Sequence, residues 1–255
     1  MSYATIDDPS AYFHTQIWTG ASGSTVNVVN DGNSDLQPDF IWAKERTSPG
    51  GYDYNHNLVD SSRGVTKTLW SDTTTAEMTA SQSNYDLQSF NTDGFTTGAP
   101  EYTNSLGGSS VTDGKVAWQW KCNGGTTSNL SGNLASVVQV NADAGFSIVK
   151  YTGSGGNGQS VLHGLGLTPE VIITKARNGV DDWYMYHKSI GNTKILKLNT
   201  TAAEASSSVY SAAAVSSSAF YVSTSLIYVG ELGADFVSYC FAPIQGYSKF
   251  WQLCR

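Results

Sequence analysis

Short runs of alternating apolar and polar residues recur along the whole chain, and helical periodicity is almost absent. Residues 12–19 (YFHTQIWT) and 116–121 (VAWQWK) are two such runs. A two-residue period is that of β-strands with one buried face. Asp93-Gly94 interrupts a third strand-like run, and Asp-Gly in that setting is a strong hairpin signal. The pattern therefore predicts an all-β chain with little helix.

One long stretch occurs twice. Residues 36–56 (LQPDFIWAKERTSPGGYDYNH) return 131 positions later as residues 167–187 (LTPEVIITKARNGVDDWYMYH), and the two can be aligned without a gap. Identical pairs include Pro38/Pro169, Lys44/Lys175, Arg46/Arg177 and His56/His187. A match of this length within one chain indicates internal duplication.

The match extends beyond this stretch in both directions, at offsets that fall along the chain. The further pairs are residues 13–20 with 146–153 at 133, 64–67 with 191–194 at 127, Phe95 with Phe220 at 125, and 116–121 with 237–242 at 121. Each change of offset can be placed in a turn-like or Ser/Thr-rich gap, where insertions are tolerated. We therefore expect two copies of one strand framework.

Copies of this size suit two β-sandwiches in tandem, of jelly-roll or concanavalin-lectin-like type. One merged sandwich built from both copies is the alternative. The expected domains are residues 1–122 and 135–255, joined by a short polar linker at 123–134 (NGGTTSNLSGNL). Residues 246–253 resemble the first strand of a third copy, and we expect them to close a sheet edge.

Composition excludes several classes of function. The chain has 255 residues, of which 40% are hydrophobic and only 14% charged, against ~25% charged in typical globular proteins. A net charge of −7 supplies no basic face for nucleic acid. No run approaches the ~20 apolar residues of a membrane span, and the N-terminus lacks the features of a signal peptide. We expect synthesis in a cytoplasm, without membrane insertion.

Catalytic motifs are missing from the sequence. None of the six Glu residues lies in the alternating E-x-D-x-E pattern of concanavalin-like glycanases. Residues 153–158 (GSGGNG) satisfy G-x-G-x-x-G, but a strand and turn follow where a dinucleotide site needs a helix. Cys122, Cys240 and Cys254 form neither a disulfide framework nor a zinc cluster. The sequence therefore predicts no catalytic residues, no cofactor and no enzymatic activity.

Asp31, Asn33 and Asp35 have the alternating oxygen-ligand spacing of a calcium loop. The EF-hand pattern next requires Gly and later Glu, where this chain has Leu36 and Trp42. These three residues are thus a weak metal candidate, and a tight turn is the favoured interpretation.

Aromatic residues precede both repeated histidines and give the best ligand-binding candidates. A sugar-stacking loop would use ring faces for the apolar side of a sugar and polar groups for its hydroxyls. The candidates are Tyr52, Tyr54, His56, Trp183, Tyr184, Tyr186 and His187. The alternative is a duplicated structural corner. We expect the repeated Lys and Arg of the Lys-x-Arg core to be solvated residues at a strand end.

Taken together, the segments resemble a family of repeat domains in structural proteins of tailed bacteriophages of marine and cyanobacterial hosts. The carrying segments are IDDPSAYF, NDGNSDLQPDFIWAKER, DSSRGVTKTL and VAWQWK in the first copy, and GFSIVKYTG, HGLGLTPEVIITKAR, GNTKILKLNTTAAE and VSYCFAPIQGYSKF in the second. The resemblance implies a virion protein of tail-fibre, spike or adhesin type. Its implied partners are other virion proteins, host-surface glycans and further copies of the chain, with a trimer favoured. A capsid decoration (head-fibre) protein and a non-virion carbohydrate-binding module are the alternatives.

Overall fold

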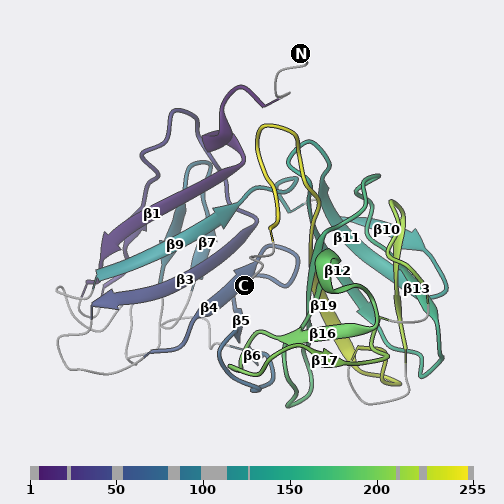
Figure 1. Ribbon diagram of the computed structural model, residues 1–255. Helices are drawn as coiled ribbons and strands as arrows, with labels where there is room; N and C mark the ends of the chain where they lie inside the picture. The colour runs from purple at the N-terminus through teal and green to yellow at the C-terminus, as the bar shows by residue number, and fades with distance from the viewer. Residues whose placement is uncertain are drawn as a thin grey trace. The chain divides into compact units, whose positions relative to one another are not determined.

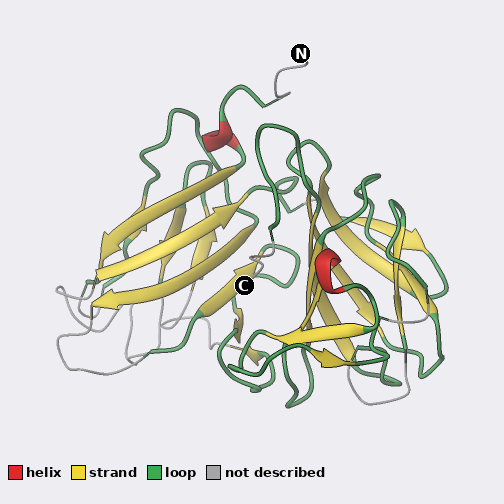
Figure 2. Cartoon of the chain, in the orientation of Figure 1, coloured by secondary structure: helices red, strands yellow, loops and turns green. Residues whose placement is uncertain are grey.

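The chain is all-β, as the alternation of residues predicts (Figure 2). The computed structural model describes residues 6–21, 24–47, 54–79, 87–98, 114–125, 127–210, 213–223 and 229–251. Over these ranges the paired strands are antiparallel, and the helical elements are the three-residue 3-10 turns η1 (Pro9–Ala11) and η2 (Lys188–Ile190). In the same ranges no helix has the length and apolar character needed to cross a membrane.

Contacts divide the chain into two compact units. The N-terminal unit comprises Asp8–Thr73 and Glu77–Gly125. The C-terminal unit comprises Thr126–Arg255 together with the short segments Met1–Asp7 and Thr74–Ala76.

The N-terminal unit contains a six-stranded and a three-stranded sheet (Figure 1). The larger sheet has the order β1 (Phe13–Thr19), β9 (Gly114–Trp120), β3 (Phe40–Thr47), β4 (Asn57–Asp60), β5 (Lys67–Trp70), β6 (Met78–Thr79), and the smaller has β2 (Asn27–Val28), β8 (Phe95–Thr97), β7 (Leu87–Phe90). Ile41, Val59 and Ala117 of the larger sheet share one hydrophobic cluster with Val28 and Phe95 of the smaller. The core of this unit therefore lies between the two sheets.

The C-terminal unit contains an eight-stranded and a two-stranded sheet. The larger has the order β10 (Ser128–Ser131), β11 (Ala135–Asn141), β12 (Phe146–Thr152), β19 (Asp235–Phe241), β14 (Val171–Ala176), β15 (Tyr184–His187), β16 (Lys194–Lys197), β17 (Ala205–Ser206), and the smaller pairs β13 (Gln159–Leu162) with β18 (Ala219–Val222). Val149, Tyr184 and Phe236 join Val161 and Phe220 in one cluster. The core again lies between a larger and a smaller sheet.

The same strand order runs through both larger sheets. The order β1-β9-β3-β4-β5-β6 corresponds to β12-β19-β14-β15-β16-β17. In the N-terminal unit Trp120 lies opposite both Phe13 and Phe40, and in the C-terminal unit Phe241 lies opposite both Phe146 and Val171. These pairs are related by the offsets of 133, 121 and 131 found in the sequence, so the repeated segments occupy equivalent ladder positions.

The strand register corrects the gap-free match of the two histidines. Phe40 of β3 lies opposite Asp60 of β4, whereas Val171 of β14 lies opposite His187 of β15. His187 is therefore the counterpart of Asp60, and His56 is not its equivalent. The N-terminal unit uses four more residues between these paired positions, and the insertion lies in the loop before β4.

Two boundary expectations also differ from the structure. Residues 128–131, inside the segment expected to be a linker, form β10 and pair with β11. Residues 246–251, the described part of the expected closing strand, form no strand, so that expectation is wrong for them. Gly246 adopts a positive φ of 79° and turns the chain, and only an isolated bridge joins Ile244 to Ser248.

Candidate functional site

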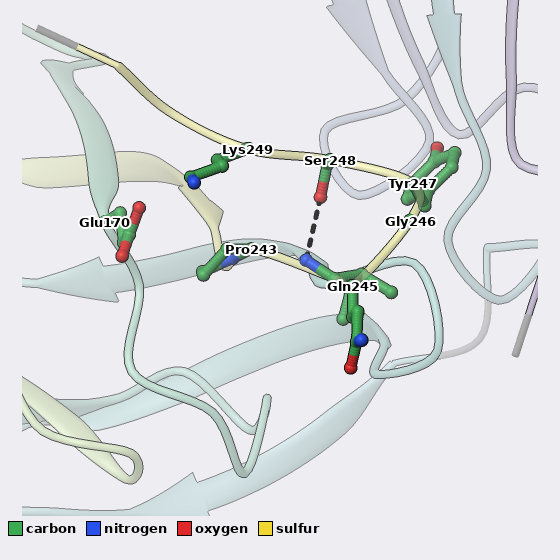
Figure 3. Close-up of a pocket in the computed structure, with 8 residues that line it drawn as sticks. Glu170, Pro243, Gln245, Gly246, Tyr247, Ser248 and Lys249 are labelled. Atoms are coloured by element: carbon green, nitrogen blue, oxygen red, sulfur yellow. Dashed lines mark hydrogen bonds between the residues drawn. The ribbon is translucent and has the colours of Figure 1, made fainter. Parts of the chain in front are cut away.

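A pocket of about 620 Å³ lies in the C-terminal unit, where β19 ends and β14 begins (Figure 3). Its walls come from one residue before β14 and from the turn after β19. The lining residues are Glu170, Pro243, Ile244, Gln245, Gly246, Tyr247, Ser248 and Lys249. The lining of the pocket therefore combines apolar rings and methyl groups with carboxylate, amide, hydroxyl and ammonium groups.

Glu170 is fixed by the sheet on both sides of its backbone. Its N–H donates to the carbonyl oxygen of Phe241 at 2.8 Å, and its own carbonyl accepts from the N–H of Lys188 at 2.8 Å. The carboxylate Oε1 accepts a hydrogen bond from Lys188 Nζ at 2.7 Å. This hydrogen bond and the charge of Glu170 raise the pKa of the Lys188 ammonium. The pocket therefore contains a carboxyl group whose backbone is held by the sheet and whose side chain is bonded to Lys188.

The turn that forms the other wall is closed by its own hydrogen bonds. The N–H of Ile244 donates to Ser248 Oγ at 3.1 Å, drawn in Figure 3, and the N–H of Ser248 donates to the carbonyl of Ile244 at 2.9 Å. Gln245 and Lys249 are exposed at its surface. Lys249 Nζ lies 3.7 Å from the ring centroid of Trp251, a cation–π contact on a side chain that is 72% exposed.

The N-terminal unit has a different arrangement at the equivalent position. Asp39 is the counterpart of Glu170 and is fully buried. Its Oδ2 accepts from the N–H groups of Cys122 (2.7 Å) and Gly124 (2.9 Å), and its Oδ1 accepts from Gly125 N–H (2.9 Å) and Ser61 Oγ (2.7 Å). Three of these four hydrogen bonds bind the turn after β9 to this carboxylate, and the fourth comes from Ser61, just after β4. The acid at this position is thus structural in one unit and open to a pocket in the other.

Three of the aromatic candidates lie in the core. Trp183, Tyr184 and Tyr186 are 0%, 1% and 6% exposed, and the two tyrosines belong to the main hydrophobic cluster. The sugar-stacking interpretation is wrong for these three rings, because no face is open to a ligand. Tyr54 is half-buried, with Lys115 Nζ 5.8 Å from its ring centroid. Tyr52 lies outside the described residues.

Both histidines make local contacts that hold loops in place. His56 Nδ1 accepts a hydrogen bond from Trp42 Nε1 at 3.1 Å, and its backbone N–H donates to Asp72 Oδ1 at 3.1 Å. His187 caps η2, where its Nδ1 accepts from the N–H of Ser189 at 3.2 Å. Neither ring lines the pocket.

The three residues of the calcium candidate lie in a turn. Asp31 Oδ1 is 2.9 Å from His14 Nε2, and the N–H of Asp31 donates to Gln16 Oε1 at 3.2 Å. Asn33 and Asp35 are exposed. In the ranges that the structure describes, no three His, Cys, Asp or Glu side chains gather as metal ligands.

The repeated lysine organises the loop that follows its strand. Lys175 is fully buried, and its Nζ donates to the carbonyls of Ala176 (3.0 Å), Gly179 (3.2 Å) and Thr74 (3.3 Å). In the N-terminal unit Lys44 Nζ donates to the carbonyl of Tyr54. The expectation of a solvated side chain is therefore wrong for Lys175. Burial lowers its pKa from 10.5 to about 8, against the opposing charges of nearby aspartates.

Lys175 should make the stability of the protein depend on pH in a defined window. Below pH 8 Lys175 is protonated in both the folded and the unfolded chain. Between about pH 8 and pH 10.5 the folded chain loses this proton and the unfolded chain keeps it. The free energy of unfolding therefore rises with pH in this window. By pH 9.5 we expect a gain on the order of 2 kcal/mol relative to Lys175→Met. The measurement is denaturant unfolding of both proteins at several pH values.

That comparison isolates Lys175 from a group with the opposite effect. Burial raises the pKa of the Cys240 thiol from 9.0 to about 12, which lowers stability above pH 9 in both proteins alike. Parallel pH profiles for the wild type and Lys175→Met would show that Lys175 does not titrate in this window.

The fold and the pocket together define an all-β protein of two units, with an open site in the C-terminal unit that has a mixed polar and apolar lining. The chain belongs to the family described as "Domain of unknown function (DUF7483)", whose model matches residues 8–252. The matched range includes strands of both units. No curated protein and no solved structure matches the chain.

The pocket was not predicted from the sequence, although the sequence contains a signal for it. Asp39 and Glu170 occupy the same position in the repeat, and the exchange changes the length of an acidic side chain. The longer side chain of Glu170, at the position where the first copy has Asp39, indicates that the two acids have different surroundings. Only the hydrogen bonds of Asp39 with residues 122–125 show that the acid is structural in the first copy.

Proposed function

We propose that this chain is a structural protein of a bacteriophage particle, of tail-fibre, spike or adhesin type. It is made in the host cytoplasm and incorporated into the virion, where its partners are other virion proteins and further copies of itself. Its C-terminal unit binds host-surface glycans through the pocket at Glu170. It acts by binding and carries no catalytic activity.

The architecture that we infer is a duplication of one β-sandwich. The matching strand order supports it, because the ladder of β1 with β9 and that of β12 with β19 keep the register that the sequence offsets require. The pairing of β2 with β8 agrees as well: Val28 lies opposite Phe95, and its counterpart Val161 lies opposite Phe220. The resemblance of the repeated segments to phage structural proteins supports the virion assignment.

The observation that carries the glycan assignment is the contrast between Asp39 and Glu170. A duplicated structural acid needs buried donors, as Asp39 has. Glu170 instead borders a pocket whose lining includes the apolar side chains of Pro243 and Ile244. Carbohydrate sites combine an apolar surface for the sugar face with a few fixed polar groups for its hydroxyls. Gln245 and Ser248 add such polar groups.

The direct test is binding of the isolated chain to an array of bacterial polysaccharides and lipopolysaccharide O-antigens. We expect at least one positive glycan, and we expect Glu170→Gln to weaken its binding about tenfold or more, as loss of one charged hydrogen bond does. The matched control is Glu231→Gln. Glu231 is exposed and precedes β19, whereas the pocket follows the other end of that strand.

A glycan that binds both variants equally would exclude the pocket as its site. Release of sugar from a bound glycan would contradict the assignment as a binding protein. The virion assignment is tested separately, by immunodetection of the chain on purified particles. Its absence from particles, together with glycan binding, would favour a free carbohydrate-binding module.

A further inference from the structure

β1 has an open edge. It pairs with β9 on one side, and no other strand of the described residues pairs with it. The N–H of Lys121 donates to the carbonyl of Tyr12, so residues 14, 16 and 18 form the hydrogen-bonded pairs with β9. The backbone groups of residues 13, 15, 17 and 19 therefore point away from the sheet.

The outward residues of this strand are accessible and uncharged. Thr15, Ile17 and Thr19 are exposed, and Ile17 is 55% exposed, unusual for an isoleucine in a strand. The strand FHTQIWT contains no Lys, Arg, Asp, Glu or Pro, the residues that usually protect an edge from pairing. One outward carbonyl, that of Ile17, accepts from the side-chain Nε2 of Gln16 at 3.1 Å.

The C-terminal unit closes the same edge with its own chain. β12 is the counterpart of β1, and β11 pairs with it over residues 136–141. β10 then pairs with β11, and its exposed residues form the outer edge. The framework shared by both units thus accepts an added antiparallel strand at this edge.

We propose that the edge of β1 is occupied by β1 of a second copy of this chain, paired antiparallel about a two-fold axis at Gln16. In this register Thr15 lies opposite Ile17 of the second copy, and Phe13 lies opposite Thr19. All four residues direct their backbone groups outward, so the hydrogen-bonding positions of the two strands coincide. The edges of two six-stranded sheets then join into one continuous sheet.

The second copy suits this edge because the strand is complementary to itself. In a register centred on Gln16, all seven residues of β1 pair with the seven residues of β1 in the second copy. This pairing removes the side chain of Ile17 from water. Each chain carries a net charge of −7, which opposes association generally, but β1 itself brings no like charges together. The side-chain hydrogen bond from Gln16 to the Ile17 carbonyl is replaced by a ladder bond in the dimer.

Sedimentation or light scattering of the full chain tests this pairing. We expect the mass of two 27.2 kDa chains, and we expect Thr15→Lys/Ile17→Lys to give the mass of one, because four lysines would then meet across the axis. The matched control is Val180→Lys/Leu232→Lys, which adds the same charge at residues 77% and 75% exposed in the C-terminal unit. That variant should remain dimeric.

Hydrogen exchange adds a readout at the strand itself. In the dimer the amides of Thr15 and Ile17 should exchange more slowly as protein concentration rises, while Thr15→Lys/Ile17→Lys should exchange fast at every concentration. A monomeric wild type would overturn the proposal, as would a dimer that survives the lysine substitutions. A trimer, which the resemblance favours, would also overturn it, because a strand that pairs with itself closes a two-fold assembly.

Discussion

Replacing Asp39 by asparagine should lower the free energy of unfolding of the N-terminal unit by about 3 kcal/mol. The buried carboxylate has two acceptor oxygens, and each accepts two hydrogen bonds. Asparagine keeps one of these oxygens and replaces the other by an NH₂ group. Turned toward Cys122 and Gly124, the NH₂ group faces two backbone donors; turned the other way, it faces the Gly125 N–H, while the Ser61 hydroxyl can rotate to accept from it.

In either orientation at least one backbone N–H loses its charged acceptor and faces a donor. A hydrogen bond to a charged group contributes about 1.5–3 kcal/mol, and a buried donor left without a partner costs about 1–3 kcal/mol. Relaxation of the turn 122–125 toward water recovers part of this. The measurement is denaturant unfolding followed by tryptophan fluorescence, because five of the seven tryptophans belong to the N-terminal unit: Trp18, Trp42, Trp70, Trp118 and Trp120.

The matched control is Glu170→Gln, the same change of charge at the equivalent position. The partner of Glu170 is Lys188, whose side chain is 62% exposed. Such pairs contribute about 0–1 kcal/mol, so we expect a change below about 0.5 kcal/mol. Equal effects at both positions would contradict the structural role assigned to Asp39.

The strand framework is the part of this fold that the sequence specifies most completely. Residues 13–19 and 114–120 alternate, and the offsets of the repeat predict which residues lie opposite one another in both units. The register succeeds because a slip of one residue would transfer every apolar side chain to the other face. The histidine match failed because a loop tolerates four inserted residues that a ladder does not.

Burial of the aromatic candidates could not be inferred from alternation. Tyr184 and Tyr186 follow a loop rich in charged and polar residues, a setting typical of an exposed site. β14, their neighbour, is buried on both faces along Val171–Ala176. The uninterrupted apolar run at residues 171–173 was the signal that both faces of this strand are covered.

The strand β10 escaped prediction for the opposite reason. Ser128–Ser131 lie at a sheet edge and are mostly exposed, so only Leu130 needs to be apolar. A strand with so little buried surface resembles a linker in composition. Its pairing is determined by the neighbouring strand β11 and not by its own residues.

Arg63→Met should lower the free energy of unfolding by about 3–5 kcal/mol. Arg63 and Asp60 have fully buried side chains, and Glu77 is 7% exposed. Nε of Arg63 donates to Asp60 Oδ2 at 2.5 Å, and Nη1 donates to Glu77 Oε2 at 3.2 Å. Removing the guanidinium leaves two carboxylates buried without their cation.

Lysine should restore only part of this loss. Nη2 of Arg63 also donates to the carbonyl of Leu58 at 2.9 Å, and Nη1 to that of Lys67 at 3.3 Å. The planar guanidinium reaches these acceptors and both carboxylates at once, whereas an ammonium is a single point with three donors. We expect Arg63→Lys to cost about 2 kcal/mol, between the wild type and Arg63→Met.

The C-terminal unit supplies the control for these substitutions. Glu204 lies 127 positions after Glu77, the offset that relates β16 and β17 to β5 and β6, so it is the counterpart of Glu77. It pairs with Lys194, and the side chains of Glu204 and Lys194 are 37% and 43% exposed. Lys194→Met removes a cation from the equivalent acid in water and should change stability by less than about 0.5 kcal/mol. If Arg63→Met lowers the free energy of unfolding no more than Lys194→Met does, burial does not determine how strongly the ion pairs of Arg63 stabilise the protein. If the large loss is confined to Arg63, the repeat retains the acid in both units but depends on its cation in one.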